Sequence, residues 1–398
     1  MRRVLVVGLA RSGRAARAAL EARGVEVVVA DRTLGNDGDL TLLDGIDALV
    51  KSPGVPGDSP LPTAARERGI PVWSEVELGG RLLPNPIVGV TGTNGKTTTT
   101  ELIGAMFRAA GLPVAVAGNV GTALTSVEPP PDAWIVCELS SFQLEDVDTF
   151  RPRVAVLLNL EPDHLDRHGT IEAYAAAKHR IFENQGPGDF AIVPRGHRPV
   201  PGTGRRVEFA ADDALPAEPL IPGAHNRENA AAATAAARAA GVPDEAIAEA
   251  LRTFPGVEHR LELVDERGGV RYVNDSKATN TAAATRALAA YDAPLHLILG
   301  GSLKGESFGE FAEAVAAAHV KIAYLVGEAT AGLAEALGHA SVPFLIAGTL
   351  ERAVAEAASA AEPGEIVLLS PACASYDQYA NFEERGQEFR RLVQNLDR

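Results

Sequence analysis

The chain opens with a run of apolar, β-branched residues at positions 4–7, and this run predicts a buried strand. A turn at 8–13, an alanine-rich helix at 14–23 and a second apolar run at 25–30 follow. A strand, a helix and a strand in this order form a unit whose strands lie parallel in one sheet. We therefore expect the chain to begin as an α/β domain.

The alternation of strands and helices begins again at residue 87, after a proline-rich junction. Apolar runs at 87–90, 134–137 and 154–158 predict buried parallel strands. The alanine-rich segment 229–240 predicts a helix, because glycine and proline follow it directly. This stretch has the pattern of a second α/β domain.

Past residue 256, apolar runs at 295–299, 322–326 and 366–369 alternate with alanine-rich helices, which predicts a doubly wound sheet. A chain of 398 residues is long enough for two or three domains. We expect an α/β fold of three domains: an N-terminal Rossmann-like domain (1–86), a central P-loop ATPase-type parallel sheet (87–256) and a C-terminal Rossmann-like doubly wound sheet (257–398).

Composition narrows the classes of function. The chain has 37 basic and 52 acidic residues, a net charge of −15, so general binding to nucleic acid or to a membrane surface is not expected. Two cysteines without CxxC spacing exclude a disulfide scaffold and a zinc ribbon and favour a reducing cytoplasm. No apolar stretch is long enough for a membrane span. We expect a soluble cytoplasmic protein.

Lysine is scarce. The 37 basic residues include only six lysines, which leaves 37 − 6 = 31 arginines. The lysines are Lys51, Lys96, Lys178, Lys277, Lys304 and Lys321. A compact, titratable ammonium is the property that lysine has and arginine lacks. The pattern therefore favours a functional role for several of these lysines, with codon bias as the alternative.

The first turn has the frame of a dinucleotide-binding loop. Gly8, Ala10 and Gly13 stand at the three positions of GxGxxG, and Asp31 ends the second strand, where a ribose hydroxyl would be bound. Alanine at the middle position weakens an NAD interpretation, because glycine there lets the backbone approach the pyrophosphate. A nucleotide site and a tight turn without a ligand both remain open.

The stretch from Gly92 to Thr97, Gly-Thr-Asn-Gly-Lys-Thr, carries the strongest signal. A strand leads into a glycine-rich loop whose N–H groups can surround a phosphate, and a helix is expected from Thr97. Lys96 would neutralise phosphate charge, and the Thr97 hydroxyl would contact magnesium. Val90 stands where a strict P-loop has its first glycine. The sequence predicts a nucleoside triphosphate site.

Other polar residues follow the ends of predicted strands in the central domain. Glu138 follows the strand at 134–137, and His164 follows the strand at 154–158, between Asp163 and Asp166. Both would reach a metal at the same sheet edge as the glycine loop. Lys178 comes one helical turn after a tyrosine. A solvated helix lysine and a capped loop histidine are the alternatives for Lys178 and His164.

Polar clusters also mark the last part of the chain. Asn226 and Asn229 open the helix expected at 229–240 and could read a nucleotide or cap the helix. Loops at 274–280, 300–305 and 370–377 each follow a predicted strand. Three such loops predict a site at the carboxyl edge of the third sheet.

Taken in order, these stretches resemble the Mur ligase family, ATP-dependent amide-bond ligases of peptidoglycan precursor synthesis. The matching motifs lie at 92–97, 163–166, 174–178, 225–229, 258–260 and 275–277. The stretches 138–143, 370–378 and 381–383 are similar to the branch of the family that joins D-glutamate to UDP-N-acetylmuramoyl-L-alanine. The resemblance covers nearly the whole chain.

The resemblance implies a role for each matching residue. It assigns ATP to Gly92, Thr93, Asn94, Gly95, Lys96, Thr97, Thr98, Asn226, Asn229, Arg260 and Asp275. It assigns two magnesium ions, one to Thr97 and Glu138, the other to His164 and an N-carbamylated Lys178. It assigns catalysis to Lys96, His164, Lys178 and Lys277.

Substrate contacts are implied in the same way. The UDP part would contact Arg11, Ser12, Asp31, Arg32, Ser52 and Gly54, and the muramoyl-alanine part Asn119, Ser140 and Gln143. D-glutamate would contact Lys277, Thr279, Lys304, Ser375, Tyr376 and Phe382. Tyr376 departs from the family, which has phenylalanine or leucine there, and the loop at 300–307 lacks an aspartate.

The implied reaction begins with phosphorylation of the alanyl carboxylate by ATP, since a carboxylate is a poor acylating agent. The amine of D-glutamate attacks the acyl phosphate, and phosphate leaves. Ligands carried by three domains imply that the third domain closes on the others. A monomer that binds neither nucleic acid nor membrane is expected.

Several alternatives stay open at this point. An NAD-dependent dehydrogenase would explain the first and last domains, and a P-loop GTPase or kinase would explain residues 87–110. A non-catalytic nucleotide-binding module is a third class. Within the family, a ligase that adds another amino acid to a UDP-muramoyl acceptor, or glutamate to folate, is the nearest alternative.

Overall fold

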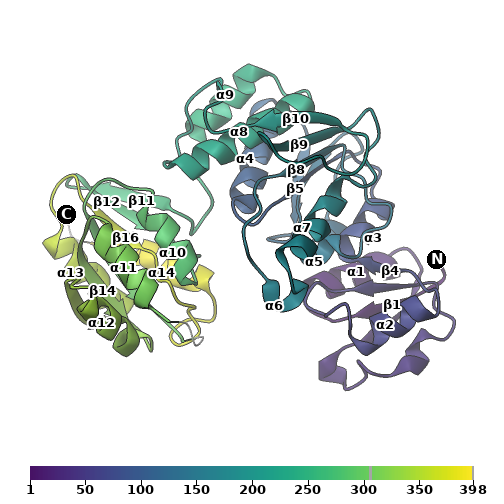
Figure 1. Ribbon diagram of the computed structural model, residues 1–398, viewed down its shortest axis with the longest axis horizontal. Helices are drawn as coiled ribbons and strands as arrows, with labels where there is room; N and C mark the ends of the chain where they lie inside the picture. Colours follow the sequence, from purple (N-terminus) through teal and green to yellow (C-terminus); the bar gives the residue numbers. More distant parts are fainter. Residues whose placement is uncertain (304–306, 397–398) are drawn as a thin grey trace. The chain divides into compact units, whose positions relative to one another are not determined.

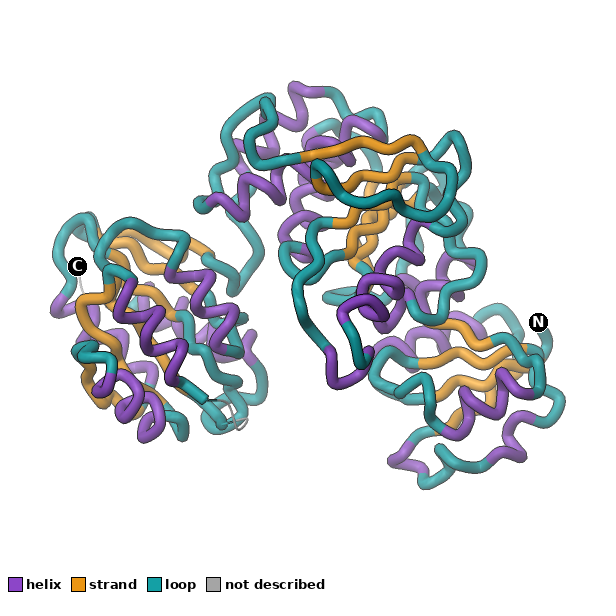
Figure 2. Tube along the Cα trace, in the orientation of Figure 1, coloured by secondary structure: helices purple, strands orange, loops and turns teal. Residues whose placement is uncertain are grey.

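The computed structural model of the protein describes residues 1–303 and 307–396, apart from the side chain of Asp166. The chain forms two compact units. One comprises Met1–Leu220 and His225–Phe254, and the other Ile221–Ala224 and Pro255–Arg398. Figure 1 follows the chain through both units, and Figure 2 shows that strands alternate with helices in each.

The first sheet lies in the N-terminal segment. Its strands are β1 (Arg3–Val7), β2 (Glu26–Ala30), β3 (Ala48–Lys51) and β4 (Val72–Ser74), and its helices are α1 (Arg11–Glu21), α2 (Pro60–Glu67) and α3 (Glu75–Leu82). The strands are parallel in the order β2-β1-β3-β4. Val4 and Val6 pack with α1 and α3, whereas Leu5 and Val7 pack with α2 on the other face. Alternation along β1 thus makes a three-layer domain.

Helix α1 begins at Arg11, three residues earlier than expected. The expected turn at 8–13 therefore contains the first turn of the helix. Glycine at position 13 allows this early start, because the helix packs tightly against the strand ends there. A Cβ on Gly13 would lie 1.8 Å from the Gly8 carbonyl oxygen and 2.8 Å from Ser52 Oγ. A glycine in this position is what brings the helix against the strand ends.

The central sheet comprises β5 (Ile87–Thr91), β6 (Val114–Gly118), β7 (Trp134–Glu138), β8 (Val154–Leu157), β9 (Phe190–Pro194) and β10 (Arg205–Phe209). Its order is β10-β9-β8-β5-β7-β6, and all strands are parallel. The fully buried β5 lies between β7 and β8. The carboxyl ends of these three strands therefore meet at one edge.

The helices of the central segment are α4 (Lys96–Ala109), α5 (Ser141–Leu144), α6 (Leu165–His168), α7 (Ile171–His179), α8 (Ala224–Ala239) and α9 (Asp244–Thr253). Helix α8 begins five residues before the predicted start at 229. Asn226 and Asn229 are therefore buried within its first turns, past the position of an N-cap residue.

The first two sheets belong to one unit because α3 packs against both. Val76 joins the hydrophobic core of the central sheet. The buried carboxylate of Glu77 accepts hydrogen bonds from the N–H groups of Asp148 (2.9 Å) and Phe150 (2.8 Å). The expected boundary at 86/87 lies inside this unit, and the three domain ranges stay a prediction.

The third sheet comprises β11 (Glu262–Arg267), β12 (Val270–Asn274), β13 (Leu295–Gly300), β14 (Val320–Val326), β15 (Phe344–Gly348) and β16 (Ile366–Leu369). Its order is β11-β12-β16-β13-β14-β15, and only β11 pairs antiparallel. Its helices are α10 (Thr281–Leu288), α11 (Gly309–Ala317), α12 (Thr330–His339), α13 (Leu350–Ala360) and α14 (Phe382–Gln394). The first three pack on one face, and α13 and α14 on the other. The predicted α/β class with a doubly wound C-terminal sheet is confirmed.

No helix in the described part of the chain is both long enough and apolar enough to cross a bilayer.

We expect the substitution Gly13→Ala to lower the free energy of unfolding of the first unit by about 3 kcal/mol, because its methyl group would collide with the Gly8 carbonyl. Both tryptophans, Trp73 and Trp134, lie in this unit, so urea unfolding followed by tryptophan fluorescence measures it selectively. Gly38→Ala is the control, since a Cβ at Gly38 meets nothing within 4 Å. Equal midpoints for the two variants would contradict the prediction.

Candidate active site

The glycine loop joins β5 to α4 at the centre of the second sheet. Thr93 N–H donates to the Asn159 carbonyl (3.1 Å), and Asn94 N–H donates to Asn159 Oδ1 (2.8 Å), so the segment after β8 holds the loop. Gly95 has φ 80°, and a Cβ there would lie 2.1 Å from Asn229 Oδ1. The structure therefore brings Asn229 of α8 beside the loop, with Asn226 one turn away on the same helix (Asn229 Nδ2 to Asn226 Oδ1, 3.4 Å).

Two lysines converge on this loop. Lys96 Nζ donates to the carbonyls of Gly92 (3.0 Å) and Thr93 (2.8 Å), and Lys178 Nζ donates to the Gly92 carbonyl (2.8 Å). Lys178 is 1% exposed, and its ammonium lies 4.5 Å from the Tyr174 ring centroid. Burial, followed by repulsion from Lys96, lowers the pKa of Lys178 to about 7. The alternative of a solvated helix lysine is therefore wrong.

Glu138 lies at the end of β7, in register with Val90 of β5. It is 3% exposed, and its Oε1 accepts a hydrogen bond from Asn119 Nδ2 (3.1 Å). Its negative charge raises the pKa of Lys178 against the other effects, as does that of Asp163. Thr97 and Thr98, in the first turn of α4, complete the residues predicted around the loop.

His164 occupies the residue before α6, with φ 51°. Its side chain is 47% exposed, and Nε2 lies 3.6 Å from Asp163 Oδ2. Its ring lies 4.8 Å from that of Phe142 and 6.4 Å from that of Tyr174, whose hydroxyl donates to Thr93 Oγ1 (3.1 Å). His164 makes no side-chain capping bond, so the capping alternative is not supported. A half-exposed imidazole is thus placed near the loop.

Ser140 and Gln143 bond to each other. Ser140 N–H and Oγ both donate to Gln143 Oε1 at 2.9 Å, and Gln143 N–H donates to Ser140 Oγ (3.3 Å). This capping box starts α5. The structure gives both residues a local structural role, and their predicted contact with substrate stays a prediction.

A cavity of about 680 Å³ opens at the carboxyl edge of the first sheet. It is lined by all six residues predicted for the UDP part and by one predicted for the muramoyl-alanine part, namely Arg11, Ser12, Asp31, Arg32, Ser52, Gly54 and Asn119. Arg11 Nη2 donates to the Asn119 carbonyl (2.6 Å), which joins α1 to the segment after β6. The first turn of α1 contributes Arg11 and Ser12, and a helix N-terminus favours an anionic ligand.

Asp31, which also lines the cavity, binds backbone on both sides of the strand end. Its Oδ1 accepts from Thr33 N–H (2.9 Å) and Thr33 Oγ1 (2.6 Å), and its Oδ2 accepts from Leu9 N–H (2.6 Å). These bonds, led by that of the Thr33 hydroxyl, lower the pKa of Asp31 to about 2. The carboxylate is therefore ionised at neutral pH and holds the turn around the α1 N-terminus.

The second unit has its own cluster at the ends of β12, β13 and β16. Asp275 is buried; its Oδ2 accepts from Ser370 Oγ (2.8 Å) and its Oδ1 from Leu261 N–H (3.3 Å). Burial raises the pKa of Asp275 to about 6, and the positive charge of Arg260 opposes that rise. The two residues predicted for ATP in this unit, Arg260 and Asp275, are thus neighbours.

The residues predicted for the amino acid lie at the same edge. Lys277 Nζ is 5.8 Å from the Phe382 ring centroid, and Ser276 Oγ donates to the Phe382 carbonyl (2.8 Å). Thr279 N–H donates to the Lys277 carbonyl (2.9 Å). Ser375 is buried, whereas Tyr376 is 72% exposed. Lys304 lies outside the described residues.

Similarity to known proteins is extensive. A D-glutamate ligase acting on UDP-N-acetylmuramoylalanine from Pelotomaculum thermopropionicum is 44% identical over 99% of this chain and 98% of its own. The corresponding ligase of Acidobacterium capsulatum is 42% identical over 98% and 96%. The Mur ligase middle domain matches residues 90–199, and the glutamate ligase domain of Mur ligases matches residues 259–373. The chain belongs to the Mur ligase family.

Solved structures of other proteins share the fold of this Mur ligase. The UDP-N-acetylmuramate-alanine ligase MurC of Thermotoga maritima has a TM-score of 0.63 at 19% identity, covering 100% of both chains. FolC of E. coli, in complex with DHPP and ADP, has a TM-score of 0.58 at 19% identity, covering 81% of this chain and 93% of its own. The family also excludes the dehydrogenase and GTPase alternatives, and the predicted resemblance is confirmed.

In the described part of this Mur ligase, no three side chains of histidine, cysteine, aspartate or glutamate form a metal-binding group. Magnesium in nucleotide sites is held by one or two carboxylates together with phosphate oxygens, so a protein cage is not required. Glu138 and the Thr97 hydroxyl are hard oxygen donors of the kind that fit it. The Lys178 ammonium is no metal ligand in its unmodified form.

Arg385 lies outside the sequence motifs described above. This arginine of α14 is 2% exposed, and burial lowers its pKa to about 10. Within the described residues, its guanidinium donates to Ser276 Oγ (3.0 Å) and to main-chain carbonyls at the ends of all three strands. These are the carbonyls of Ser276 (2.9 Å), Gly300 (3.4 Å), Cys373 (3.1 and 3.2 Å) and Ala374 (3.2 Å).

A signal for Arg385 exists in the sequence. Arg385, Phe389 and Leu392 follow one another at helical spacing on the buried face of α14. An arginine in the register of an apolar face indicates a cation with buried partners, because burying a charge without them is costly.

We expect Arg385→Met to raise the hydrogen-exchange rates of amides at 276–279 and 373–378 by more than about tenfold. Methionine fills the volume but leaves buried carbonyls without a donor, which costs about 1–3 kcal/mol for each group. Mass spectrometry measures the exchange, and the tryptophan-monitored unfolding of the first unit should not change. Arg390→Met, on the same helix, removes only partly exposed ion pairs to Glu258 and Glu262 and serves as the control. Identical exchange in the two variants would argue against the role of Arg385.

Proposed function

We propose that this Mur ligase joins D-glutamate to the alanyl carboxylate of UDP-N-acetylmuramoyl-L-alanine, with ATP converted to ADP and phosphate. The observation that carries the proposal is the cavity of about 680 Å³, which is lined by seven residues that the resemblance in sequence assigns to the sugar nucleotide. The D-glutamate ligases that are 42–44% identical over nearly the whole chain support the choice of acceptor.

ATP would bind at the glycine loop. The N–H groups of the loop and the N-terminus of α4 suit the phosphates, and Lys96 already lies against the loop, 3.0 Å from the Gly92 carbonyl. Thr97 and Glu138 would hold Mg²⁺, which supplies positive charge at the β- and γ-phosphates when bound. Asn226 and Asn229 would contact the nucleotide from α8, and the resemblance to the family also assigns Arg260 and Asp275 to ATP.

The reaction follows from the chemistry of the carboxylate. An oxygen of the alanyl carboxylate attacks the γ-phosphorus of ATP, the bond to ADP breaks, and an acyl phosphate forms. The neutral amine of D-glutamate then attacks the acyl carbon, the C–O bond to phosphate breaks, and the nitrogen loses its extra proton. Lys96 stabilises the negative charge that develops on the transferred phosphoryl oxygens.

The acceptor would bind at the carboxyl edge of the third sheet. D-glutamate carries two carboxylates, and the cationic side chains of Lys277 and Lys304 are suited to them. Ser375, Thr279 and Phe382 would complete the site. Arg385 adds a buried positive charge beneath these loops, which favours a dianionic ligand despite the net charge of −15.

Lys178 would serve as a carbamate. Its neutral amine attacks CO₂ to form N–COO⁻ and releases a proton, which converts a cation beside Glu138 into a carboxylate-like ligand for a second Mg²⁺ with His164. A pKa of about 7 keeps a large share of the amine neutral near physiological pH. Burial of the lysine at the loop supports this modification.

We also propose that the enzyme is a cytoplasmic monomer whose partners are its small-molecule substrates alone. A net charge of −15 disfavours general nucleic-acid binding.

We expect phosphate release from ATP in the presence of UDP-N-acetylmuramoyl-L-alanine only when D-glutamate is the acceptor. L-glutamate, L-alanine, glycine and L-lysine should give rates near background. Release with one of these instead would keep the acyl-phosphate mechanism and refute the choice of acceptor.

In Lys96→Met the rate should fall by about 10²–10³-fold, since one stabilising cation is lost, while the sugar nucleotide still binds.

We expect a carbamate ¹³C resonance from Lys178 in protein equilibrated with ¹³C-bicarbonate. The neutral fraction of an amine with a pKa of about 7 falls from about nine tenths at pH 8 to about one tenth at pH 6, so the resonance should weaken as pH falls through 7. Lys178→Arg should lack the resonance, whereas Lys321→Arg, at a partly exposed ion pair, should retain it. A resonance that survives in Lys178→Arg would refute the assignment.

A further inference from the structure

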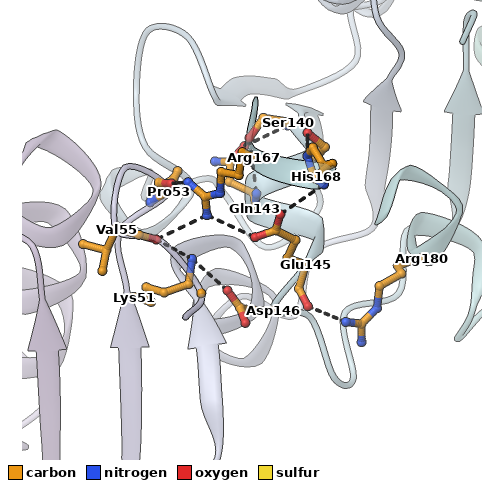
Figure 3. Close-up of polar contacts among 12 residues, drawn as sticks. Lys51, Pro53, Val55, Ser140, Gln143, Glu145, Asp146, Arg167, His168 and Arg180 are labelled. Atoms are coloured by element: carbon orange, nitrogen blue, oxygen red, sulfur yellow. Dashed lines mark hydrogen bonds and ion pairs between the residues drawn. The ribbon is translucent and has the colours of Figure 1, made fainter. Parts of the chain in front are cut away.

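An arginine of the central segment, Arg167, contacts the backbone of Pro53 and Val55, two residues that line the cavity (Figure 3). Residues 52–56 line the cavity. Arg167 Nη1 donates to the Pro53 carbonyl (2.7 Å), and its Nη2 donates to the Val55 carbonyl (3.2 Å). The side chain is 17% exposed, so these bonds are largely shielded from water. The backbone of the cavity wall thus depends on a cation 112 and 114 residues away in the chain.

The same guanidinium is fixed on its other side. Its Nη2 lies 3.1 Å from Glu145 Oε2, and its central carbon lies 4.2 Å from the Phe142 ring centroid. An arginine that stacks on a ring and forms an ion pair has little freedom to move by itself. Arg167 therefore joins the cavity wall to α5 and the residue that follows it.

A second cation, Lys51, connects the same part of the cavity wall to the residue after Glu145. Lys51 at the end of β3 is 1% exposed, and its Nζ donates to the Val55 carbonyl (3.0 Å) and lies 3.0 Å from Asp146 Oδ2. The carbonyl of Val55 thus accepts from both Lys51 and Arg167, whose carboxylate partners are consecutive residues. Movement of the cavity wall would have to break the hydrogen bonds that both cations donate to the Val55 carbonyl.

Arg167 also belongs to α6, the single helical turn that His164 precedes. Arg167 N–H donates to the His164 carbonyl (3.1 Å). His168, the next residue, has its Nε2 3.0 Å from Ser141 Oγ and its Nδ1 3.4 Å from Glu145 Oε1. The orientation of this turn, and with it His164, is set by the contacts that hold Arg167 and His168.

We propose that Arg167 is a positioning residue that couples binding of the sugar nucleotide in the cavity to the placement of His164 beside the nucleotide loop. The inference rests on the proposed function, because it takes the sugar nucleotide as the ligand of the cavity. A ligand that orders residues 52–56 orders the Pro53 and Val55 carbonyls, and the guanidinium transmits that order to α6. Lysine cannot replace arginine fully here, since one ammonium cannot reach two carbonyls and a carboxylate in this planar arrangement.

Arg180 offers a matched control. It donates to the carbonyls of Glu145 and Val147 (2.6 Å to Val147), so it holds the same segment from the other side. Its remaining hydrogen bond goes to Glu183, and within the described residues none reaches 52–56. Arg180→Met therefore removes an arginine that contacts residues 145–147 but leaves the bonds of Arg167 to the cavity wall in place.

The test measures the affinity for UDP-N-acetylmuramoyl-L-alanine by calorimetry, with and without a non-hydrolysable ATP analogue and Mg²⁺. In the wild-type chain we expect each ligand to tighten binding of the other by about fivefold or more. In Arg167→Met the ratio should fall below about twofold, in Arg167→Lys it should be intermediate, and in Arg180→Met it should equal the wild-type ratio. A wild-type ratio of one, or an unchanged ratio in Arg167→Met, overturns the proposal.

A general loss of structure is separated from loss of coupling by a second variant. Glu145→Gln keeps the shape of the Glu145 side chain and both carbonyl contacts of Arg167 but removes their ion pair, so it should also lower the ratio of the two affinities. It replaces Arg167→Met as the test if Arg167→Met does not fold. Equal thermal melting of Glu145→Gln and Arg180→Met with different ratios supports coupling, and equal ratios refute it. A wild-type chain that binds the ATP analogue but not the sugar nucleotide overturns the proposed function itself.

Discussion

The convergence of two lysine ammonium groups on the Gly92 carbonyl is the interaction on which the catalytic edge depends. Lys96 and Lys178 lie 3.0 and 2.8 Å from that oxygen, and Lys178 is almost fully buried. Burial of the Lys178 ammonium, followed by repulsion from the like charge of Lys96, lowers the pKa of Lys178. Negative charge opposes this repulsion: Glu138 provides it at the end of β7, and phosphates or the proposed carbamate would add to it. The loop thus carries concentrated positive charge, which suits phosphate groups.

The second unit also contains a buried cation, the guanidinium of Arg385. Arg385 is surrounded by main-chain carbonyls and a serine hydroxyl, so its buried charge is solvated by dipoles of the protein. Because those carbonyls belong to three different strand ends, one side chain sets the positions of three loops. A buried cation in each unit serves the same purpose, which is to hold backbone and to favour a negative ligand.

Much of this arrangement could be predicted from the sequence. The strand at 366–369 and the loop between β5 and α4 were placed by their pattern, because short apolar runs bounded by glycine have few alternative structures. The predicted starts of helices α1 and α8 are too late, because Ser12, Gly13 and Asn226 are residue types common in turns. Both helices begin earlier in the structure. In the fold, Gly13 fits against the Gly8 carbonyl and Asn229 against Gly95, and these contacts outweigh local preference.

The sequence by itself determined the α/β class, the order of the elements and the chemical groups at each strand end, because periodicity and loop composition are local properties. Only the tertiary structure decided which of those ends share a site. Ser140 and Gln143 turned out to cap a helix, Arg385 joined three loops, and Arg167 reached the Pro53 carbonyl across 114 positions. A pattern of apolar and polar residues reports which face of an element is buried, but the partner on that face depends on sheet order and packing, which no local segment encodes.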